Sequence, residues 1–164
     1  MTEEYSRKQV VGLLKEKAQL KQKVYDHTLE AFKLLKNLQQ KTVDEYNKQL
    51  QDADARVQLK YRSRGEFESE LKVAGDLLLF SMHSNIFEFD REHHIWSLPY
   101  VKQDLLNSYC GIIQVYNFLS DSFKYNREED LGYMITRIFT NHENHFFVEG
   151  KRQGDFSYKH FGEQ

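Results

Sequence analysis

The chain has 164 residues, of which 40% are hydrophobic and 29% charged, and its formal net charge is −2. This length and composition suit one globular domain with its own core, and they exclude a disordered chain and a multidomain one. The small negative charge provides no concentrated positive field, so we expect neither nucleic acid nor a membrane as a partner. The single cysteine, Cys110, excludes an internal disulfide framework and a thiolate-rich zinc site.

The amino terminus is polar and mixed in charge, and no apolar segment follows it before the lysines that begin at Lys15. We therefore expect no signal peptide. The longest apolar run, residues 77–80, is far shorter than the roughly 20 residues that span a bilayer. The sequence predicts a cytoplasmic protein whose cysteine is reduced and buried.

A helical arm is predicted for residues 1–52, with one long helix over about residues 7–50. Its apolar residues recur at steps of three and four, which is typical of a helix. The main row consists of Val10, Leu13, Leu20, Val24, Ala31, Leu34 and Leu38. A second row beside it widens the apolar stripe and consists of Val11, Leu14, Ala18, Tyr25, Phe32 and Leu35.

A stripe of this width needs two neighbours, which we expect to be the sheet of the same domain and a helix of a second copy. A helix of about 40 residues is roughly 60 Å long, more than the rest of the chain can cover. The sequence therefore predicts a homo-oligomer that assembles through this helix. The alternative is a single core helix that packs only on its own domain. The basic run at Lys15, Lys17, Lys21 and Lys23 is typical of a solvated helix face, or else it contacts an acidic partner or nucleic acid.

Residues 53–164 are predicted to form an aromatic-rich body, because residues 51–164 hold 19 of the 23 aromatic residues. The fold class is α+β, with a mostly antiparallel sheet of about five or six strands and one packed helix. Period-two alternation and short apolar runs mark the strands. They fall at about residues 57–61, 67–73, 77–82 (continuing to 89), 94–98, 111–119 and 145–149.

The first two strands are expected to form a hairpin around Ser63-Arg64-Gly65, since glycine suits the left-handed position of a three-residue loop. This register pairs Arg62 with Glu66, Lys60 with Glu68 and Gln58 with Glu70. The packed helix is predicted at about residues 127–141. Asn126 and Glu129 resemble a capping box there, and an apolar row follows it at helical spacing: Leu131, Met134, Ile135, Ile138 and Phe139.

Two E-x-K patterns, Glu70/Lys72 and Glu149/Lys151, suggest one kind of chemistry. A carboxylate and a lysine two residues apart on a strand share a face, and with an upstream aspartate they can hold a divalent metal and polarise a phosphodiester. The upstream aspartates are Asp52 and Asp54 for the first pattern and Asp130 for the second. The structural alternative for Glu70 is the charged face of the hairpin.

Histidines form a second candidate site, because His93-His94 and the pair His142 and His145 could meet at one end of the sheet. Neutral imidazoles are good ligands for zinc or nickel. A metal site needs three or four converging ligands, whereas the sequence offers only pairs, and polar residues in turns are the alternative interpretation. We predict no cofactor, with a divalent metal as the alternative.

A third candidate is a small-ligand pocket at the end of the strand over residues 111–119. Tyr116 would provide an aromatic wall, and Asn117, Asp121 and Ser122 would provide orienting polar groups. The alternative is that residues 120–122 only end the strand and bond local backbone N–H groups.

The order of a long helix and an aromatic-rich body is similar to the general layout of small dimeric sensor or adaptor modules, an analogy of architecture alone. We expect a non-enzymatic, homo-oligomeric interaction module or small-ligand-sensing module, with an unknown protein or small molecule as partner. The alternative function is a metal-dependent hydrolase or nuclease that uses the E-x-K patterns or the histidines.

Overall fold

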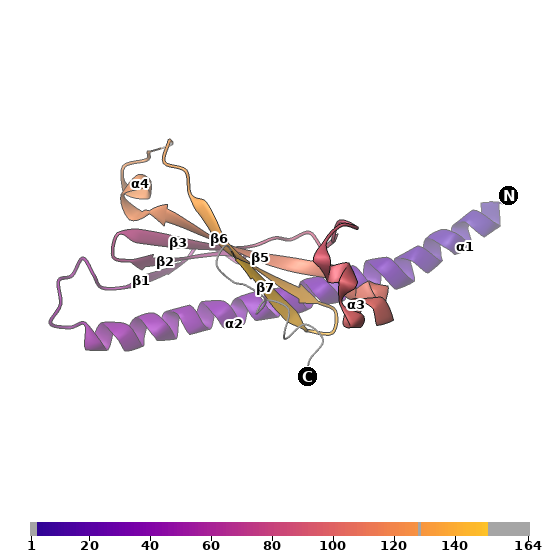
Figure 1. The fold of residues 1–164 in the computed structure, drawn as a ribbon, viewed down its shortest axis with the longest axis horizontal. Helices are drawn as coiled ribbons and strands as arrows, with labels where there is room; N and C mark the ends of the chain where they lie inside the picture. Colours follow the sequence, from indigo (N-terminus) through magenta and orange to yellow (C-terminus); the bar gives the residue numbers. More distant parts are fainter. Residues whose placement is uncertain (1–2, 128, 151–164) are drawn as a thin grey trace.

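The computed structural model describes residues 3–127 and 129–150, without the side chains of Glu3, Glu4 and Phe123. One long amino-terminal helix lies along one face of an antiparallel sheet (Figure 1), which confirms the α+β class. Within the described ranges, none of the helices is both long enough and apolar enough to span a bilayer.

The amino-terminal helix is built from three consecutive pieces. It begins with α1 (Glu3–Leu13), continues through a π-helical turn, η1 (Leu14–Ala18), and ends with α2 (Gln19–Gln49). The helix predicted over residues 7–50 is therefore confirmed. The buried side chains of α2 are Leu20, Val24, Thr28, Phe32, Gln39 and Val43. They follow one another mostly at steps of four residues, so one narrow face of α2 lies on the sheet.

The sheet has the strand order β1-β2-β3-β5-β6-β7, and every neighbouring pair is antiparallel. A short strand, β4, pairs with the beginning of β5. The strands are β1 (Lys60–Ser63), β2 (Glu68–Val73), β3 (Asp76–Met82), β4 (Phe87–Glu88), β5 (Tyr109–Leu119), β6 (Tyr133–Asn141) and β7 (Phe146–Gly150). The central strands predicted at 77–82 and 111–119 and the last strand predicted at 145–149 are confirmed.

Each face of the sheet carries its own apolar core. On the helix face, Phe32 of α2 packs with Met82 of β3 and Ile113 of β5. On the outer face, the segment between β4 and β5 covers one end of the sheet. It holds η2 (His94–Ser97), α3 (Pro99–Gln103) and η3 (Leu105–Ser108). The buried residues of this outer core are Phe89, Ile95, Val101, Cys110, Ile112, Phe139 and Phe147.

The helix predicted at about residues 127–141 is wrong, because residues 133–141 form β6. β6 is covered on both faces at its carboxyl-terminal end, with Ile138 toward α2 and Phe139 in the outer core. A strand covered on both sides loses its alternation of apolar and polar residues. A register shift between Val115 and Tyr116 of β5 leaves Ile135 as an extra residue of β6. This extra residue interrupts the strict period of two in β6, so the spacing of its apolar residues is closer to that of a helix. Asn126, the proposed cap, has a positive φ of 49° and follows the short α4 (Ser120–Lys124).

Two further local predictions are corrected. The hairpin pairs Arg62 with Glu70 and Ser63 with Ser69, so its loop is longer than three residues, although Gly65 does have a positive φ of 110°. The longer loop lets Phe67 pack against the core under α2. The strand predicted at 94–98 is the 3-10 turn η2, which local hydrogen bonds stabilise, such as that from the Ile95 N–H to Nδ1 of His93.

Candidate functional site

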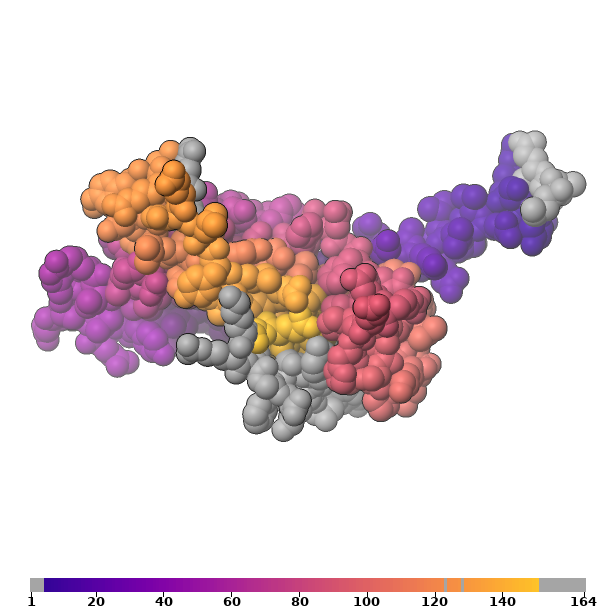
Figure 2. All heavy atoms as spheres, turned by 45° about the horizontal axis from the view of Figure 1, so that its top comes forward, coloured from indigo at the N-terminus to yellow at the C-terminus, as the bar shows by residue number. Residues whose placement is uncertain are grey.

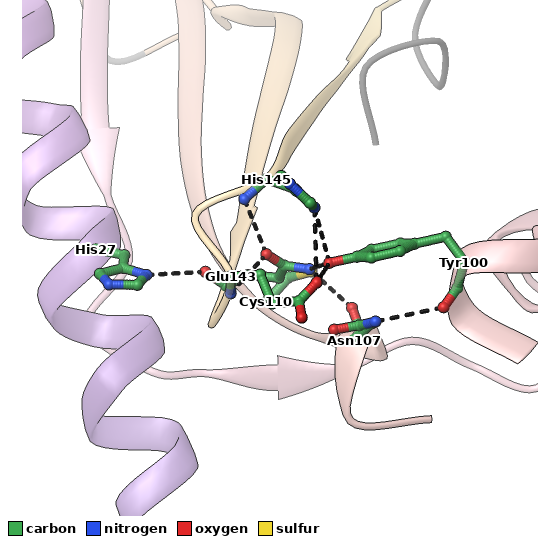
Figure 3. A network of polar contacts seen from close by, with 7 residues as sticks. His27, Tyr100, Asn107, Cys110, Glu143 and His145 are labelled. Atoms are coloured by element: carbon green, nitrogen blue, oxygen red, sulfur yellow. Dashed lines mark hydrogen bonds and ion pairs between the residues drawn. The ribbon is translucent and has the colours of Figure 1, made fainter. Parts of the chain in front are cut away.

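A network of polar side chains lies at the turn between β6 and β7, where α2, α3 and the sheet meet (Figure 3). The Tyr100 hydroxyl from α3 is its centre. It donates to Oε2 of Glu143, accepts a hydrogen bond of 2.8 Å from Nδ2 of Asn141, and lies 2.9 Å from Nδ1 of His145. Because the single phenolic proton goes to Glu143, Nδ1 of His145 must be the donor in its contact. The network thus specifies which nitrogen of His145 carries the proton.

Asn141, the last residue of β6, joins this network to the backbone. Its Oδ1 accepts hydrogen bonds from the N–H groups of Glu143 and His145, which closes the turn. Its own carbonyl oxygen lies 3.3 Å from Nδ1 of His27 on α2. One fully buried side chain therefore ties the turn to α3, while its backbone ties the turn to the long helix.

Burial governs the acid–base properties of this region. It raises the pKa of Tyr100 far above its usual value, and the hydrogen bond to Glu143 raises it further. The phenol therefore stays protonated near neutral pH and serves as a hydrogen-bond donor rather than as a base. Burial also raises the pKa of the Cys110 thiol, which is shielded from solvent, so this cysteine is not an activated nucleophile.

His142, in the same turn, points its Nδ1 into a buried position where the described residues provide no hydrogen-bond partner. Burial lowers the pKa of His142, Glu143 and Asp104 oppose this effect, and Lys23 and His27 add to it. His142 is therefore held in its neutral form.

The two predicted histidine pairs are not brought to one centre. His93 bonds through Nε2 to Oε1 of Glu149 at 2.9 Å and packs on the Phe89 ring, with ring centroids 4.4 Å apart. His94 contacts Ser97 in η2, whereas His145 belongs to the Tyr100 network. In residues 3–127 and 129–150, no three His, Cys, Asp or Glu side chains gather in a way that could hold a metal ion.

Glu70 and Lys72 of the first E-x-K pattern and Glu149 of the second lie on the outer face, on β2 and β7, which are separated by β3, β5 and β6. Glu70 is ion-paired with Arg62 at 2.7 Å and with Arg64 at 3.5 Å, and Lys72 pairs across the hairpin with Lys60. Both carboxylate oxygens of Glu70, which a metal ion would need as ligands, are thus paired with arginines.

The second pattern also leaves its carboxylate engaged. Glu149 accepts from Arg137 at 2.7 Å and lies against His93, while Lys151 is outside the described residues. Asp54 binds its neighbour Arg56 in the exposed chain after α2, and Asp52 is exposed there. Asp130 accepts from Ser122, and among the described residues neither aspartate set gathers with Glu70 or Glu149 into a group that could hold a metal ion.

The predicted ligand-pocket residues do not face one another. Tyr116 and Asn117 are consecutive on β5 and therefore point to opposite faces of the sheet. Asn117 Nδ2 bonds to the Tyr133 hydroxyl at 2.8 Å and to Asp76 at 3.2 Å. Ser122 bonds to Asp130, and Asp121 lies in the first turn of α4 with its carbonyl accepting from Tyr125. These groups end strands and close turns.

A groove of about 530 Å³ lies between α2 and the β6–β7 edge, on the helix face of the sheet. Its walls are mostly aliphatic and aromatic, with Leu34 and Leu38 from the helix and Ile138 and Phe146 from the strands. Glu30, Thr140 and Asn144 provide its polar groups. The volume is within the range of ligand and peptide sites, about 300–1,000 Å³.

The amino-terminal part of the long helix forms a second apolar surface. α1 extends past the end of the sheet (Figure 1), and in the space-filling view it projects away from the rest of the molecule (Figure 2). Val10, Val11, Leu13 and Leu14 are 48–57% exposed. We call residues 5–18 the projecting segment.

Sequence reasoning found the apolar residues of the projecting segment and of α2, because both belong to one helical stripe. It does not predict the strand side of the groove, since the apolar spacing around Ile138 indicates a helix. It also missed the Tyr100 network, because residues 100–109 show no periodicity that would place Tyr100 beside the β6–β7 turn. No local signal in the sequence links residues that lie 41 to 45 positions apart.

Comparison of the chain with protein-family models, with curated proteins and with solved structures gave no match. The function must therefore be inferred from the geometry of the molecule itself.

Proposed function

We propose that this protein is a non-enzymatic interaction module that assembles with copies of itself through its long amino-terminal helix. The projecting segment is the observation that carries the proposal. Its four aliphatic side chains are about half exposed on a helix that extends past the sheet. The segment continues into α2 and needs no helix nucleus of its own, but burying its exposed aliphatic side chains against a partner surface would be favourable.

The polar clusters support an architectural rather than a catalytic role. The Tyr100 hydroxyl is surrounded by three polar side chains, and burial keeps its proton in place. The carboxylates of Glu70 and Glu149 are neutralised by arginines. Catalytic acids and bases instead need a pKa close to the working pH and access to a substrate.

The first experiment is native mass spectrometry of the untagged full chain, which reports the number of copies and any retained metal or small molecule. We expect two copies at micromolar concentration. A single copy would refute the proposed assembly. A retained small molecule with a single copy would favour the ligand-sensing alternative, and a retained metal would favour the hydrolase alternative.

A pair of matched double variants tests the role of the projecting segment. The variant Leu13→Glu/Leu14→Glu replaces two of its four exposed aliphatic side chains with a charged residue that is still a good helix former. The control Leu105→Glu/Leu119→Glu changes two leucines of similar exposure, 57% and 60%, elsewhere on the surface. We expect the first variant to weaken the dimer by at least about 100-fold, near 2.7 kcal/mol. Equal dimer affinity of the two variants would refute the assignment.

A further inference from the structure

The turn between β6 and β7 is closed by its first residue, Asn141, which also faces α2. Its side-chain Oδ1 accepts from the N–H groups of Glu143 and His145, and its carbonyl oxygen accepts from the Asn144 N–H at 3.1 Å. Asn144 has a positive φ of 64°, in the left-handed region that asparagine tolerates better than most residues. The shape of the turn thus depends on local hydrogen bonds that converge on one asparagine.

Two histidines meet where this turn lies against α2. The His27 ring on α2 points toward the turn, with Nδ1 3.3 Å from the Asn141 carbonyl oxygen (Figure 3). His142, the next residue of the turn, has a buried Nδ1 for which the described residues provide no hydrogen-bond partner. A neutral imidazole leaves one nitrogen without a proton, whereas an imidazolium carries an N–H on both nitrogens. A protonated His142 would therefore bury an N–H group that finds no acceptor in the described part of the chain, which is unfavourable.

The charged and titratable groups around His142 come from α2, from the turn itself and from the start of η3. Glu143 of the turn and Asp104, which caps η3, favour a positive charge on His142. Lys23 and His27, one helical turn apart on α2, disfavour it. Burial is the largest effect, so the pKa of His142 lies below its ordinary value of 6.5. When His142 becomes charged, it faces Lys23 and, once that ring is also protonated, His27.

We propose that the β6–β7 turn is a pH-sensitive latch, which packs against α2 while His142 is neutral and separates from α2 when His142 binds a proton. The packed turn binds fewer protons than the released turn, because the pKa of His142 is lowered only in the packed form. The packed form is therefore favoured above about pH 6.5, and its population decreases as the pH falls toward the lowered pKa. Asn144 and Phe146 line the groove beside α2, so release of the turn also rearranges one wall of that groove. The latch goes beyond the proposed self-assembly and does not depend on it.

Amide hydrogen exchange of the full chain at pH 7 and pH 5 tests the latch. Protection factors, which correct for the slower intrinsic exchange at pH 5, report the opening of each segment. We expect the protection of residues 141–147 to fall by about five-fold or more at pH 5, since the released turn binds one more proton. Opening of the turn alone exposes little surface, so its exchange at pH 5 should not depend on urea. Exchange in β5, which lies in the middle of the sheet, should instead increase with urea, because it requires global unfolding.

The variant His142→Gln keeps a polar side chain in the turn but cannot bind the proton. Its turn protection should differ by less than about two-fold between pH 7 and pH 5. The matched control is His83→Gln, which changes an exposed histidine just after β3 and should lose turn protection as the unmodified chain does. A second measurement needs no variant. It is an NMR pH titration of the unmodified chain, in which the His142 ring signals are assigned from isotope-labelled protein.

The expected result is a loss of turn protection at pH 5 that is independent of urea and absent from His142→Gln. Equal turn protection at the two pH values overturns the latch. The same urea dependence for the turn and for β5 also overturns it, because the turn then does not open separately. An equal loss in His142→Gln shows that another group controls the opening, which overturns the role of His142. If the variant does not fold, the NMR titration decides, since a pKa of His142 at or above 6.5 overturns the proposal.

Discussion

Substituting alanine for Gly111 tests how closely α2 lies on the sheet. Gly111 is a buried residue of β5, directly beneath Thr28 of the helix. A Cβ atom at position 111 would be 2.1 Å from Oγ1 of Thr28 and 2.9 Å from its Cβ and Cγ2 atoms. Ordinary contacts at such atoms begin near 3.4 Å. Either the helix or the strand must therefore move by more than about 1 Å to admit one methyl group.

The expected cost of Gly111→Ala is about 2–3 kcal/mol of the free energy of unfolding, at the upper end of the range for overpacked cores. Thr28 cannot simply rotate away without loss, because its hydroxyl donates to the Val24 carbonyl at 2.7 Å. The control is Gly75→Ala, where a Cβ meets nothing within 4 Å. That variant should keep its stability or gain up to about 1 kcal/mol, since alanine restricts the unfolded chain.

The assay is urea denaturation of all variants at one protein concentration, since self-association makes stability depend on concentration. A double-mutant cycle with Thr28→Ala separates the clash from a general loss of strand structure. Removing Oγ1 and Cγ2 of Thr28 should recover at least half of the cost of Gly111→Ala. If Gly111→Ala is as stable as Gly75→Ala, or if Thr28→Ala recovers nothing, the close packing of α2 on β5 is wrong.

Two further predictions concern polar groups under the helix and at the turn. Ser69 donates to Oε1 of Gln39 at 2.8 Å between sheet and helix, while Nε2 of Gln39 has no partner in the described residues. Ser69→Ala should therefore lower the free energy of unfolding by about 1–2 kcal/mol in urea denaturation. Adding Gln39→Met should recover most of the lost free energy, because it removes the polar group left without a partner. If the double variant is no more stable than Ser69→Ala, this account of the Ser69–Gln39 pair is wrong. Burial lowers the pKa of His142 below 6.5, so the folded state binds fewer protons than the unfolded state. The resulting stability is present above about pH 6.5 and is lost as the pH falls toward the folded-state pKa of His142. The variant His142→Gln should therefore show a smaller decline of the urea midpoint between pH 7 and pH 5 than the unmodified chain. Parallel pH profiles of the two proteins would show that His142 does not contribute.

The long helix and the central strands could be predicted because their signals are local. Apolar residues at steps of three and four over residues 10–38 have one simple explanation, a helix. The strand at 111–119 is marked by a run of β-branched and aromatic residues between turn signals. The sequence over β6 instead indicates a helix, because Ile138 and Phe139 are buried on opposite faces and thus erase the alternation that marks a strand.

The candidate sites were harder to predict, since each depends on contacts between distant residues. The E-x-K patterns were visible in the sequence, but the arginines that neutralise Glu70 and Glu149 depend on strand register. The hairpin register itself depends on Phe67, which packs under α2 and requires a longer loop than the glycine alone suggests. Turn chemistry gives a register only where the core does not require another one.

The apolar stripe of the long helix explains both the fold and the proposed assembly. Over α2, one narrow face supplies Val24, Phe32 and Val43 to the sheet, and this face is completely or nearly buried. The stripe is wider than that face, so Leu34 and Leu38 remain beside it, and the helix also continues beyond the sheet with Leu14 exposed. A stripe that served only the domain's own core would need neither the extra width nor the extra length. Both excesses are apolar surface that the proposed assembly with further copies could bury.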